Sequence, residues 1–588
     1  MYPKVKRVRR GDRVYEYLEL VEGHRVDGQV RQRVVAKLGR LDELTATGRL
    51  EQLVAGLARL DSPPVGTRRE VGPLLLVTHY LNRLGLTEIV DDTAPMRGRA
   101  SATHGEIIAA LVANRLCGPA PLYDVAGWAT SAAVAELIGV PALLLNDDRL
   151  GRALEALAPV AEQVRCQLLL RAIETFAVAD ASRLHLDLTA VRFAGRHTDS
   201  ALVAKGWAAD RSFGRQVKTL QATTTTGVSL YFRPHKGSAN ELPAFTAALD
   251  ALRACLPAGL VAVADSGLGY LTTLCALDTA ATRFVVPLRA DTGWAQRFRA
   301  DAGTLDALAE LDYRSQREQH LPPDRRTVYK GLLRPFTVTD RQTGQHRLRV
   351  AYIHSSEEAA SVTEARERTL THAETALTRI RNGLGGRYYK TKTQVDTRVA
   401  KIIGPHIADL ITVTTGPARH GKPSIHWQRN HDAITAAAQL DGLYALATNL
   451  PDPPNRELTA LDVLTVYKDQ WIVEQRHRDL KQTLKVRPIF LHNDDRIEAL
   501  IAIIGIALLI YGLIEAELRH ALGPDTPLPG LLPEHRAAIP TSRAVLTAFH
   551  GLHLTYTPTG PHLDRLTPPQ RAILAHLDIP LPWPEKTN

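Results

Sequence analysis

The stretch LVAVADSGLGYLTTLCALDTAATRFVVPLR, residues 260–289, determines the class of fold. Its two short apolar runs, 260–265 and 283–289, are typical of buried strands, and the segment 269–278 between them predicts a helix. Strands that alternate with helices favour a mixed α/β layer with a central sheet. Asp265 closes the first run before a glycine turn, at the carboxyl end of the strand, where open α/β sheets place their sites.

Further strands are predicted on both sides of this unit. HLDLTAVRF, residues 185–193, alternates like a strand, and residues 218–234 predict two strands joined at Gly227. The apolar run 442–449 predicts one more strand, separated from the unit above by residues 290–441. Because that separating segment contains long β-like runs and a charged helix, we interpret it as a mainly β domain inserted into a discontinuous α/β core.

The N-terminal third has two different patterns. Residues 13–39 alternate with the period of a strand around Asp27-Gly28, which predicts a hairpin, and six of the first thirteen residues are Lys or Arg. Residues 41–175 have helical periodicity broken by prolines. The predicted division is a basic β-rich region (1–50), a helical region (51–178), a first core part (179–289), the insertion (290–441), a second core part (442–522) and a C-terminal extension (523–588).

Composition narrows the class of protein. The 588 residues carry a formal net charge of +10 and give a pI of about 9.4, which favours an acidic partner such as nucleic acid. The apolar run 500–514 is shorter than the roughly 18–20 residues that cross a bilayer, so it predicts a buried core helix and no membrane association. The widely spaced cysteines form no CxxC pair, which indicates neither a zinc site nor a disulfide framework and fits a reducing cytoplasm. These cysteines are Cys117, Cys166, Cys255 and Cys275.

The segment YKDQWIVEQRHRDLKQ, residues 467–482, predicts an amphipathic helix. At about 100° per residue, six of its side chains fall within an arc of roughly 100°, beside an apolar stripe. An ordinary solvated face is the alternative, because Glu474 and Arg478 stand at the i,i+4 spacing of an intrahelical ion pair. The six side chains are Tyr467, Gln470, Trp471, Glu474, Arg478 and Lys481.

Three acidic residues are candidates for one metal site: Asp187 and Asp265 on predicted strands and Glu474 on the predicted helix. Oxygen ligands select hard cations such as Mg²⁺ or Mn²⁺, and two such ions promote in-line displacement at phosphorus. Among 62 acidic residues a chance trio is the alternative, and Asp265 could instead cap a turn. His185 shares a strand face with Asp187 and is expected to be packed or to support the site, and Thr189 would orient a metal-bound water.

Three motifs carry a resemblance to a known family. HLDLTAV, VAVADSGL and Tyr467-x2-Gln470-x3-Glu474-x6-Lys481 resemble the three signature regions of DDE transposases of bacterial insertion sequences. The closest group has Tyr, two residues, Arg, three residues, Glu, six residues and Lys in the third region. The local sequences RPHKGSANE, YALATN and RPIFLHNDDRIEAL agree with it. The resemblance covers roughly residues 183–289 and 440–515.

The resemblance implies an RNase H-like core, in which the three acids hold two divalent ions, Mg²⁺ or Mn²⁺. Such an enzyme cuts double-stranded DNA at the terminal inverted repeats of its element and joins the freed 3′ ends to target DNA. Synapsis of two ends implies a homodimer, and the enzyme works on the nucleoid in the bacterial cytoplasm. From charge and position, the N-terminal 175 residues are expected to bind the ends. Contacts to DNA are expected from Tyr467, Gln470, Trp471, Arg478 and Lys481.

One residue departs from the family pattern. Gln470 stands where the group has Arg, so it can hydrogen-bond a phosphate but brings no charge. Arg476 or Arg478 would then supply the missing charge.

Other functional classes stay open at this point. The chain could be a DNA-binding relative without catalysis, or a nuclease of the same fold without strand transfer. The glycines of Ser266-Gly267-Leu268-Gly269 suggest a dinucleotide site, but Thr272 occupies the third glycine position of that fingerprint. The pairs Glu474-x-x-His477 and Glu517-x-x-His520 suggest a di-iron helix bundle, which the predicted central sheet disfavours.

Overall fold

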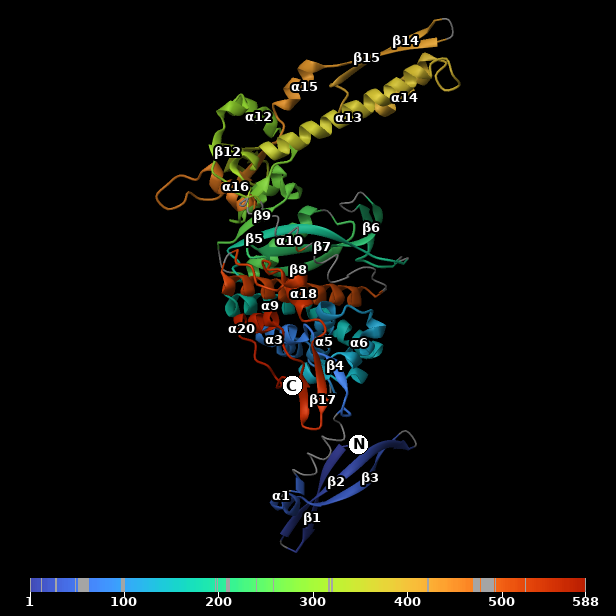
Figure 1. Ribbon diagram of the computed structural model, residues 1–588, viewed down its shortest axis with the longest axis vertical. Helices are drawn as coiled ribbons and strands as arrows, with labels where there is room; N and C mark the ends of the chain where they lie inside the picture. Colours follow the sequence, from blue (N-terminus) through green and yellow to red (C-terminus); the bar gives the residue numbers. More distant parts are fainter. Residues whose placement is uncertain are drawn as a thin grey trace. The chain divides into compact units, whose positions relative to one another are not determined.

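The computed structural model has a mixed α/β fold made of two compact units (Figure 1). The first unit comprises Met1–Arg69, His553–Arg565 and Leu581–Asn588, and the second comprises Glu70–Leu552 and Leu566–Pro580. The C-terminal extension predicted at 523–588 is thus divided between the two units. The structure describes all residues except 1, 12, 27–28, 48, 51–62, 97–100, 196, 198, 208–211, 240, 257–258, 316–317, 319–320, 420–421, 469–475, 477–490, 492, 524 and 587–588.

The first unit is built from strands. An antiparallel sheet has the order β1-β2-β3, and the predicted hairpin is confirmed because Val26 of β2 pairs with Gln29 of β3. A second sheet has the order β18-β17-β4. The elements are β1 (Tyr2–Arg10), β2 (Arg13–Val26), β3 (Gln29–Arg40), α1 (Leu41–Ala46), β4 (Arg68–Glu70), β17 (His553–Thr557) and β18 (Gly560–Leu563).

From Glu70 on, the described part of the predicted helical region folds as helices in the second unit. Its central helix α5 (His104–Cys117) starts at a capping box, in which the Thr103 hydroxyl accepts the Glu106 N–H and the Glu106 carboxylate accepts the Thr103 N–H. All residues of α5 from Ile107 to Leu116 are buried, as expected of a helix surrounded by others. The others are α3 (Leu74–Leu84), α4 (Leu86–Thr93), α6 (Val125–Ser131), α7 (Val134–Leu137), α8 (Asp147–Leu157) and α9 (Ala161–Thr175).

A ten-stranded sheet forms the centre of the second unit. The order is β11-β12-β13-β16-β10-β9-β5-β7-β6, with β8 also paired to β7. Strand β5 runs antiparallel to β7 and parallel to β9, and β10 runs parallel to β9. The strands predicted at 185–193, 218–234, 260–265, 283–289 and 442–449 are confirmed. They are β5 (Arg183–Arg192), β6 (Ala204–Trp207), β7 (Phe213–Thr224), β8 (Ser229–Lys236), β9 (Val261–Ala264), β10 (Arg283–Pro287), β11 (Ala309–Leu311), β12 (Tyr329–Asp340), β13 (Gly344–Ser355) and β16 (Leu443–Thr448).

The segment 290–441 differs from the mainly β insertion that the sequence predicts. Its strands β11, β12 and β13 extend the central sheet, because the apolar strand β16 pairs with β13 on one side and β10 on the other. The rest, residues 356–438, is largely helical and has its own apolar cluster. We call residues 356–438 the arm. Its elements are α13 (Ser356–Asn382), α14 (Lys392–Ile402), β14 (Ile411–Arg419), β15 (Lys422–Arg429) and α15 (His431–Ala438).

The apolar run 500–514 lies in the buried helix α18 (Asp494–Leu522), as predicted. By length and composition α18 could cross a membrane, but 94% of its most apolar window is buried inside the protein. In Figure 1 the sheet lies on one side of α18 and the helices α3, α5 and α9 on the other. The remaining helices are α10 (Glu241–Cys255), α11 (Leu271–Thr279), α12 (Trp294–Asp301), α16 (Ala460–Lys468), α19 (Ser542–Ala548) and α20 (Pro568–His576).

Helix α18 approaches the sheet closely through a glycine. A Cβ added at Gly512 would lie 2.7 Å from the Gly227 carbonyl oxygen and 2.9 Å from the Val228 Cα. We therefore predict that Gly512→Ala lowers the free energy of unfolding by about 1–3 kcal/mol through overpacking, although alanine itself favours helix. Denaturant unfolding measures this change. The control is Gly404→Ala, where an added Cβ meets nothing within 4 Å, and equal stabilities of the two variants would contradict the prediction.

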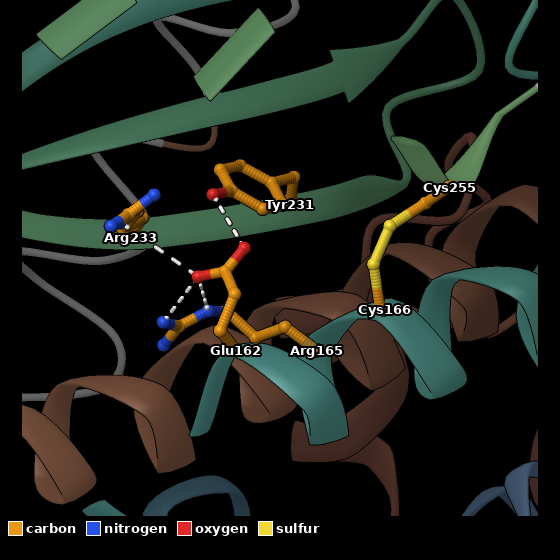
Figure 2. The surroundings of a disulfide bond; sticks show 6 residues. All are labelled: Glu162, Arg165, Cys166, Tyr231, Arg233 and Cys255. Carbon is orange, nitrogen blue, oxygen red and sulfur yellow. Dashed lines mark hydrogen bonds and ion pairs between the residues drawn. A yellow bond between two sulfur atoms is a disulfide. The ribbon is translucent and has the colours of Figure 1, made fainter. Parts of the chain in front are cut away.

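The cysteine spacing indicated no disulfide framework, and this prediction is wrong for two of the four cysteines. Figure 2 shows a disulfide between Cys166 of α9 and Cys255 of α10, whose Cα atoms are 6.0 Å apart. The two residues are 89 positions apart, so no local motif could reveal a pair that only the packing of α9 beside α10 creates. Nearby, the Glu162 carboxylate of α9 accepts a 2.9 Å hydrogen bond from the Tyr231 hydroxyl of β8. Cys117 and Cys275 are free.

Candidate active site

The register of β5 and β9 sets two predicted site residues side by side. The last paired residues of these parallel strands are Leu186 and Ala264, and Asp187 and Asp265 follow them directly. Neighbouring strands lie about 4.8 Å apart, and side chains alternate between the faces of a sheet. Both aspartates therefore stand next to each other at the carboxyl end of β9, on the face opposite to the buried Leu186 and Ala264.

Local hydrogen bonds orient both carboxylates. Asp187 is half-buried, and its Oδ1 accepts the Leu188 backbone N–H at 2.7 Å. Asp265 is exposed, and its Oδ1 accepts the Gly267 N–H at 2.9 Å, so it caps the short turn Ser266–Leu268. The capping role anticipated for Asp265 is thus present. It is compatible with binding a metal, because an ionised carboxylate has two oxygens and about four lone-pair sites.

His185 is a packed histidine on the same face of β5. Its side chain is fully buried, and neither ring nitrogen has a hydrogen-bond partner among the described residues. Burial, assisted by the charge of Arg183, lowers the pKa of His185 to about 3. The ring is therefore neutral at physiological pH and brings no positive charge to the site. Thr189, two residues after Asp187, is also buried, and its carbonyl accepts the Thr219 hydroxyl at 3.4 Å.

Of the six polar side chains predicted on the helix at 467–482, the structure describes Tyr467. This residue lies at the end of α16, half-buried against an apolar cluster, with its ring centroid 6.2 Å from that of Tyr444. A role of Tyr467 in DNA contact stays a prediction. Among the described residues, no group of three or more His, Cys, Asp or Glu side chains is placed to hold a metal. The other five fall outside the described residues: Gln470, Trp471, Glu474, Arg478 and Lys481.

Arg476 is described, and it cannot supply the charge that Gln470 lacks. Its side chain is 2% exposed, and its Nε donates a 2.7 Å hydrogen bond to the Gly227 carbonyl. Its Nη2 lies 3.0 Å from the carboxylate of Glu515, on α18. The suggestion that Arg476 contacts DNA is therefore wrong, because its guanidinium is bound inside the core.

Two residues that the sequence analysis missed lie at the same end of the sheet as the aspartates. Arg289 follows β10, and its guanidinium lies 4.3 Å from the ring centroid of Tyr270, whose exposed fraction is 41%. The Arg289 side chain also contacts Asp291, at 3.4 Å. The sequence signal that could have identified Arg289 is its place as a cation just after the buried strand β10, which runs parallel to β9. A partly exposed cation at the same end of the sheet as two carboxylates suits a substrate that carries phosphates.

Residues from the two alternative sites, the dinucleotide site and the di-iron site, have structural roles. A Cβ at Gly269 would lie 2.2 Å from the Pro287 carbonyl oxygen, so this glycine permits close approach to β10 and needs no nucleotide. Glu517, from the second ExxH pair, forms hydrogen bonds of 2.7 and 3.0 Å with Arg83. This pairing accounts for the Glu517 carboxylate without a metal.

Comparison with sequence families supplies the identity that this geometry suggests. Residues 3–65 match the IS1634 family transposase N-terminal domain, and residues 67–165 match a domain of unknown function, DUF4277. Residues 179–510, more than half of the chain, match the transposase DDE domain, and this range contains both aspartates. No curated protein matches the chain. The chain belongs to the DDE transposases of insertion sequences.

Proposed function

We propose that this chain cleaves DNA at the terminal inverted repeats of its insertion sequence and joins the freed 3′ ends to target DNA. The observation that carries the proposal is the placement of Asp187 and Asp265 side by side on adjacent parallel strands, within the range that matches the transposase DDE domain. The reaction is phosphoryl transfer, in which catalysis depends on positioning and on stabilising charge at phosphorus.

We assign β8, β7, β5, β9 and β10 to an RNase H-like core. In the sheet, β8, β7 and β5 are neighbouring antiparallel strands, with β5 innermost. The parallel strands β9 and β10 continue the sheet on the other side of β5. Residues 290–355 extend this core, so we propose that the independent insertion is the arm rather than the whole of 290–441. The arm and the sheet extension together still separate Asp265 from the predicted helix at 467–482.

The donor set fits Mg²⁺ or Mn²⁺. Asp187 and Asp265 supply carboxylate oxygens, the ligands that hard divalent cations prefer, and the N–H groups of Leu188 and Gly267 hold these carboxylates in orientation. Two bound ions would activate the attacking hydroxyl and stabilise the leaving oxygen. The neighbouring Arg289, held against Tyr270, is positioned to contact a phosphate of the bound strand.

Glu474 is our candidate for the third carboxylate. On a helical wheel, residues two positions apart point about 160° away from each other. Because Arg476 faces the core, Glu474 is expected on the opposite side, where the polar row of the sequence lies. Contacts to the DNA strand are then expected from the rest of that row, which is Tyr467, Gln470, Trp471, Arg478 and Lys481.

The biological setting follows from the family. Synapsis of two element ends requires two copies of the active site, so we propose a homodimer on DNA. We also propose that the enzyme works in the bacterial cytoplasm, on the DNA that carries its element.

The test is an assay of the wild-type chain on the DNA that flanks its reading frame. Labelled duplexes carrying the inverted repeats should be cut at the 3′ ends and joined to a target plasmid when Mg²⁺ or Mn²⁺ is present. Neither step should occur when EDTA removes the metal. Duplexes with scrambled repeats serve as the control. Cleavage without joining would instead indicate a nuclease, and binding without cleavage under both metals would indicate a relative that lacks catalysis.

A further inference from the structure

The end of the arm carries a large excess of positive charge. We define the arm tip as residues 379–430, which run from the end of α13 through α14 to the end of β15. This range has ten Lys or Arg residues against two acidic ones, a net charge of +8, compared with +10 for the whole chain. The first part of α13, residues 356–378, has two basic and five acidic residues. The arm therefore reverses its charge along its length.

The arm tip is a folded surface and not a solvated charge run. Its apolar side chains form a separate cluster in which α13 packs against α14 and the β14–β15 hairpin. At the base of that cluster, Arg429 of β15 forms ion pairs of 2.8 and 2.9 Å with Glu367 and Glu374 of α13. The buried members of the cluster are Leu370, Ala373, Leu377, Ile380, Val395, Ile407, Ile411 and Ile425.

Most cations of the arm tip stay available to a partner. Six of them are exposed and form no ion pair within the described part of the chain. Arg381 lies 4.9 Å from the ring centroid of Trp427, and Tyr388, next to Arg387, has an exposed fraction of 61%. A surface of clustered cations with exposed aromatic groups suits a polyanion with sugar and base surfaces. The six cations are Arg379, Arg387, Lys390, Arg398, Lys401 and Lys422.

We propose that the arm tip binds the backbone of duplex DNA independently of its sequence. Helix α13, at about 1.5 Å per residue, places the tip roughly 40 Å along its axis from the strand that precedes it. That length exceeds one turn of B-DNA, so the arm is long enough for its tip to reach duplex beyond the few nucleotides held at the active site. Phosphate contacts from Lys and Arg set position but carry no sequence information. The inference depends on the family's use of DNA, not on the metal chemistry proposed above.

The experiment measures binding of the full chain to a labelled duplex of random sequence over a range of salt concentrations. The tip variant replaces Arg379, Arg387, Lys390 and Lys401 together by Gln. We expect its Kd to rise at least about tenfold near 0.1 M salt. The slope of log K against log salt should become shallower by up to about 3.6, because each lost phosphate contact removes roughly 0.9.

The matched control replaces four other exposed arginines, each beside a carboxylate, and so makes the same change in net charge. Their exposed side-chain fractions are 64–71%, and we expect their loss to change Kd less than about threefold. Equal effects of the tip and control variants would overturn the proposal, since net charge alone would explain them. The control residues are Arg152, Arg314, Arg368 and Arg536.

Two further measurements test whether the contact is purely ionic and whether it is independent of DNA sequence. Lys390→Arg with Lys401→Arg keeps the charge and should bind like wild type, whereas weakened binding would overturn a purely ionic contact. A loss confined to duplexes that carry the inverted repeats would overturn sequence independence. The tip variant should still cut a short duplex that ends near the cleavage point, so a failure of catalysis is recognised separately from a failure of the arm contact.

Discussion

Replacing Asp187 or Asp265 by Asn should lower the rate of Mg²⁺-dependent cleavage of the element ends at least about 1,000-fold, equivalent to roughly 4 kcal/mol in the barrier. The two residues come directly after the paired residues Leu186 and Ala264 on adjacent parallel strands, so both carboxylates would hold the same ion. The amide of Asn keeps the shape and one acceptor oxygen but lacks the charge that a divalent ion requires. Glu474→Gln should cause a loss of the same order.

Several readouts separate a lost metal ligand from a lost fold. Single-turnover cleavage gives the rate, and fluorescence anisotropy should show that end binding changes little. Mg²⁺ should raise the melting temperature of the wild type and leave that of the aspartate variants nearly unchanged, because the ion binds only the folded site. Asp306→Asn, at an exposed position, is the control. Cleavage within tenfold of wild type by either variant would remove that residue from the site.

The core of the fold was predictable because its signals are local. Strands such as 260–265 are short apolar runs between turns, and the register that brings Asp187 beside Asp265 follows from two such runs pairing in parallel. The limits of the insertion were not predictable in this way. Strand β13 has the same pattern whether it joins a separate sheet or the central one, and only the pairing with β16 decides.

Long-range contacts account for the other differences between sequence and structure. Cys166 and Cys255 pair because two helices pack side by side, and the spacing of the cysteines in the sequence does not reveal this contact. Arg476 looked like one more cation on a charged helix, although on a helical wheel it falls beside the apolar stripe, on the side away from the polar row. Its partners Gly227 and Glu515 are 249 and 39 residues away, so the sequence around it could not identify it as a core residue.

The buried pair of Arg476 and Glu515 should dominate the stability of the second unit. Their side chains are 2% and 7% exposed, and the Glu515 carboxylate also accepts the Ser542 N–H at 2.8 Å. Removal of one partner leaves a buried charge without its counter-charge, so we expect Arg476→Met or Glu515→Gln to lower the free energy of unfolding by about 3–5 kcal/mol. Arg152→Met, in a pair that is 71% exposed on both sides, should change it by less than about 1 kcal/mol.

The pH dependence of unfolding gives a second test of the same pair. Burial opposes ionisation of Glu515, but the charges of Arg476 and Arg519 outweigh it and hold the pKa of this carboxyl below its usual value. A carboxyl with a lowered pKa in the folded state stabilises the protein above its unfolded pKa of about 4.3, and this stability is lost as the pH falls through the folded value. Denaturant unfolding at pH 7 and pH 4 should therefore show a larger acid-dependent loss for the wild type than for Glu515→Gln.

The double variant Arg476→Met with Glu515→Leu decides whether the charges themselves are needed. If the cost of each single variant comes from the charge left behind, the double variant should recover much of the stability. We expect the double variant to cleave DNA poorly even though it is stable. The Arg476 Nε also holds the Gly227 carbonyl at the turn between β7 and β8, and that contact ties the segment next to Glu474 to the sheet that bears Asp187. A stable double variant with full cleavage would show that the pair serves stability alone, whereas a stable variant that fails to cut assigns it the positioning of the third carboxylate.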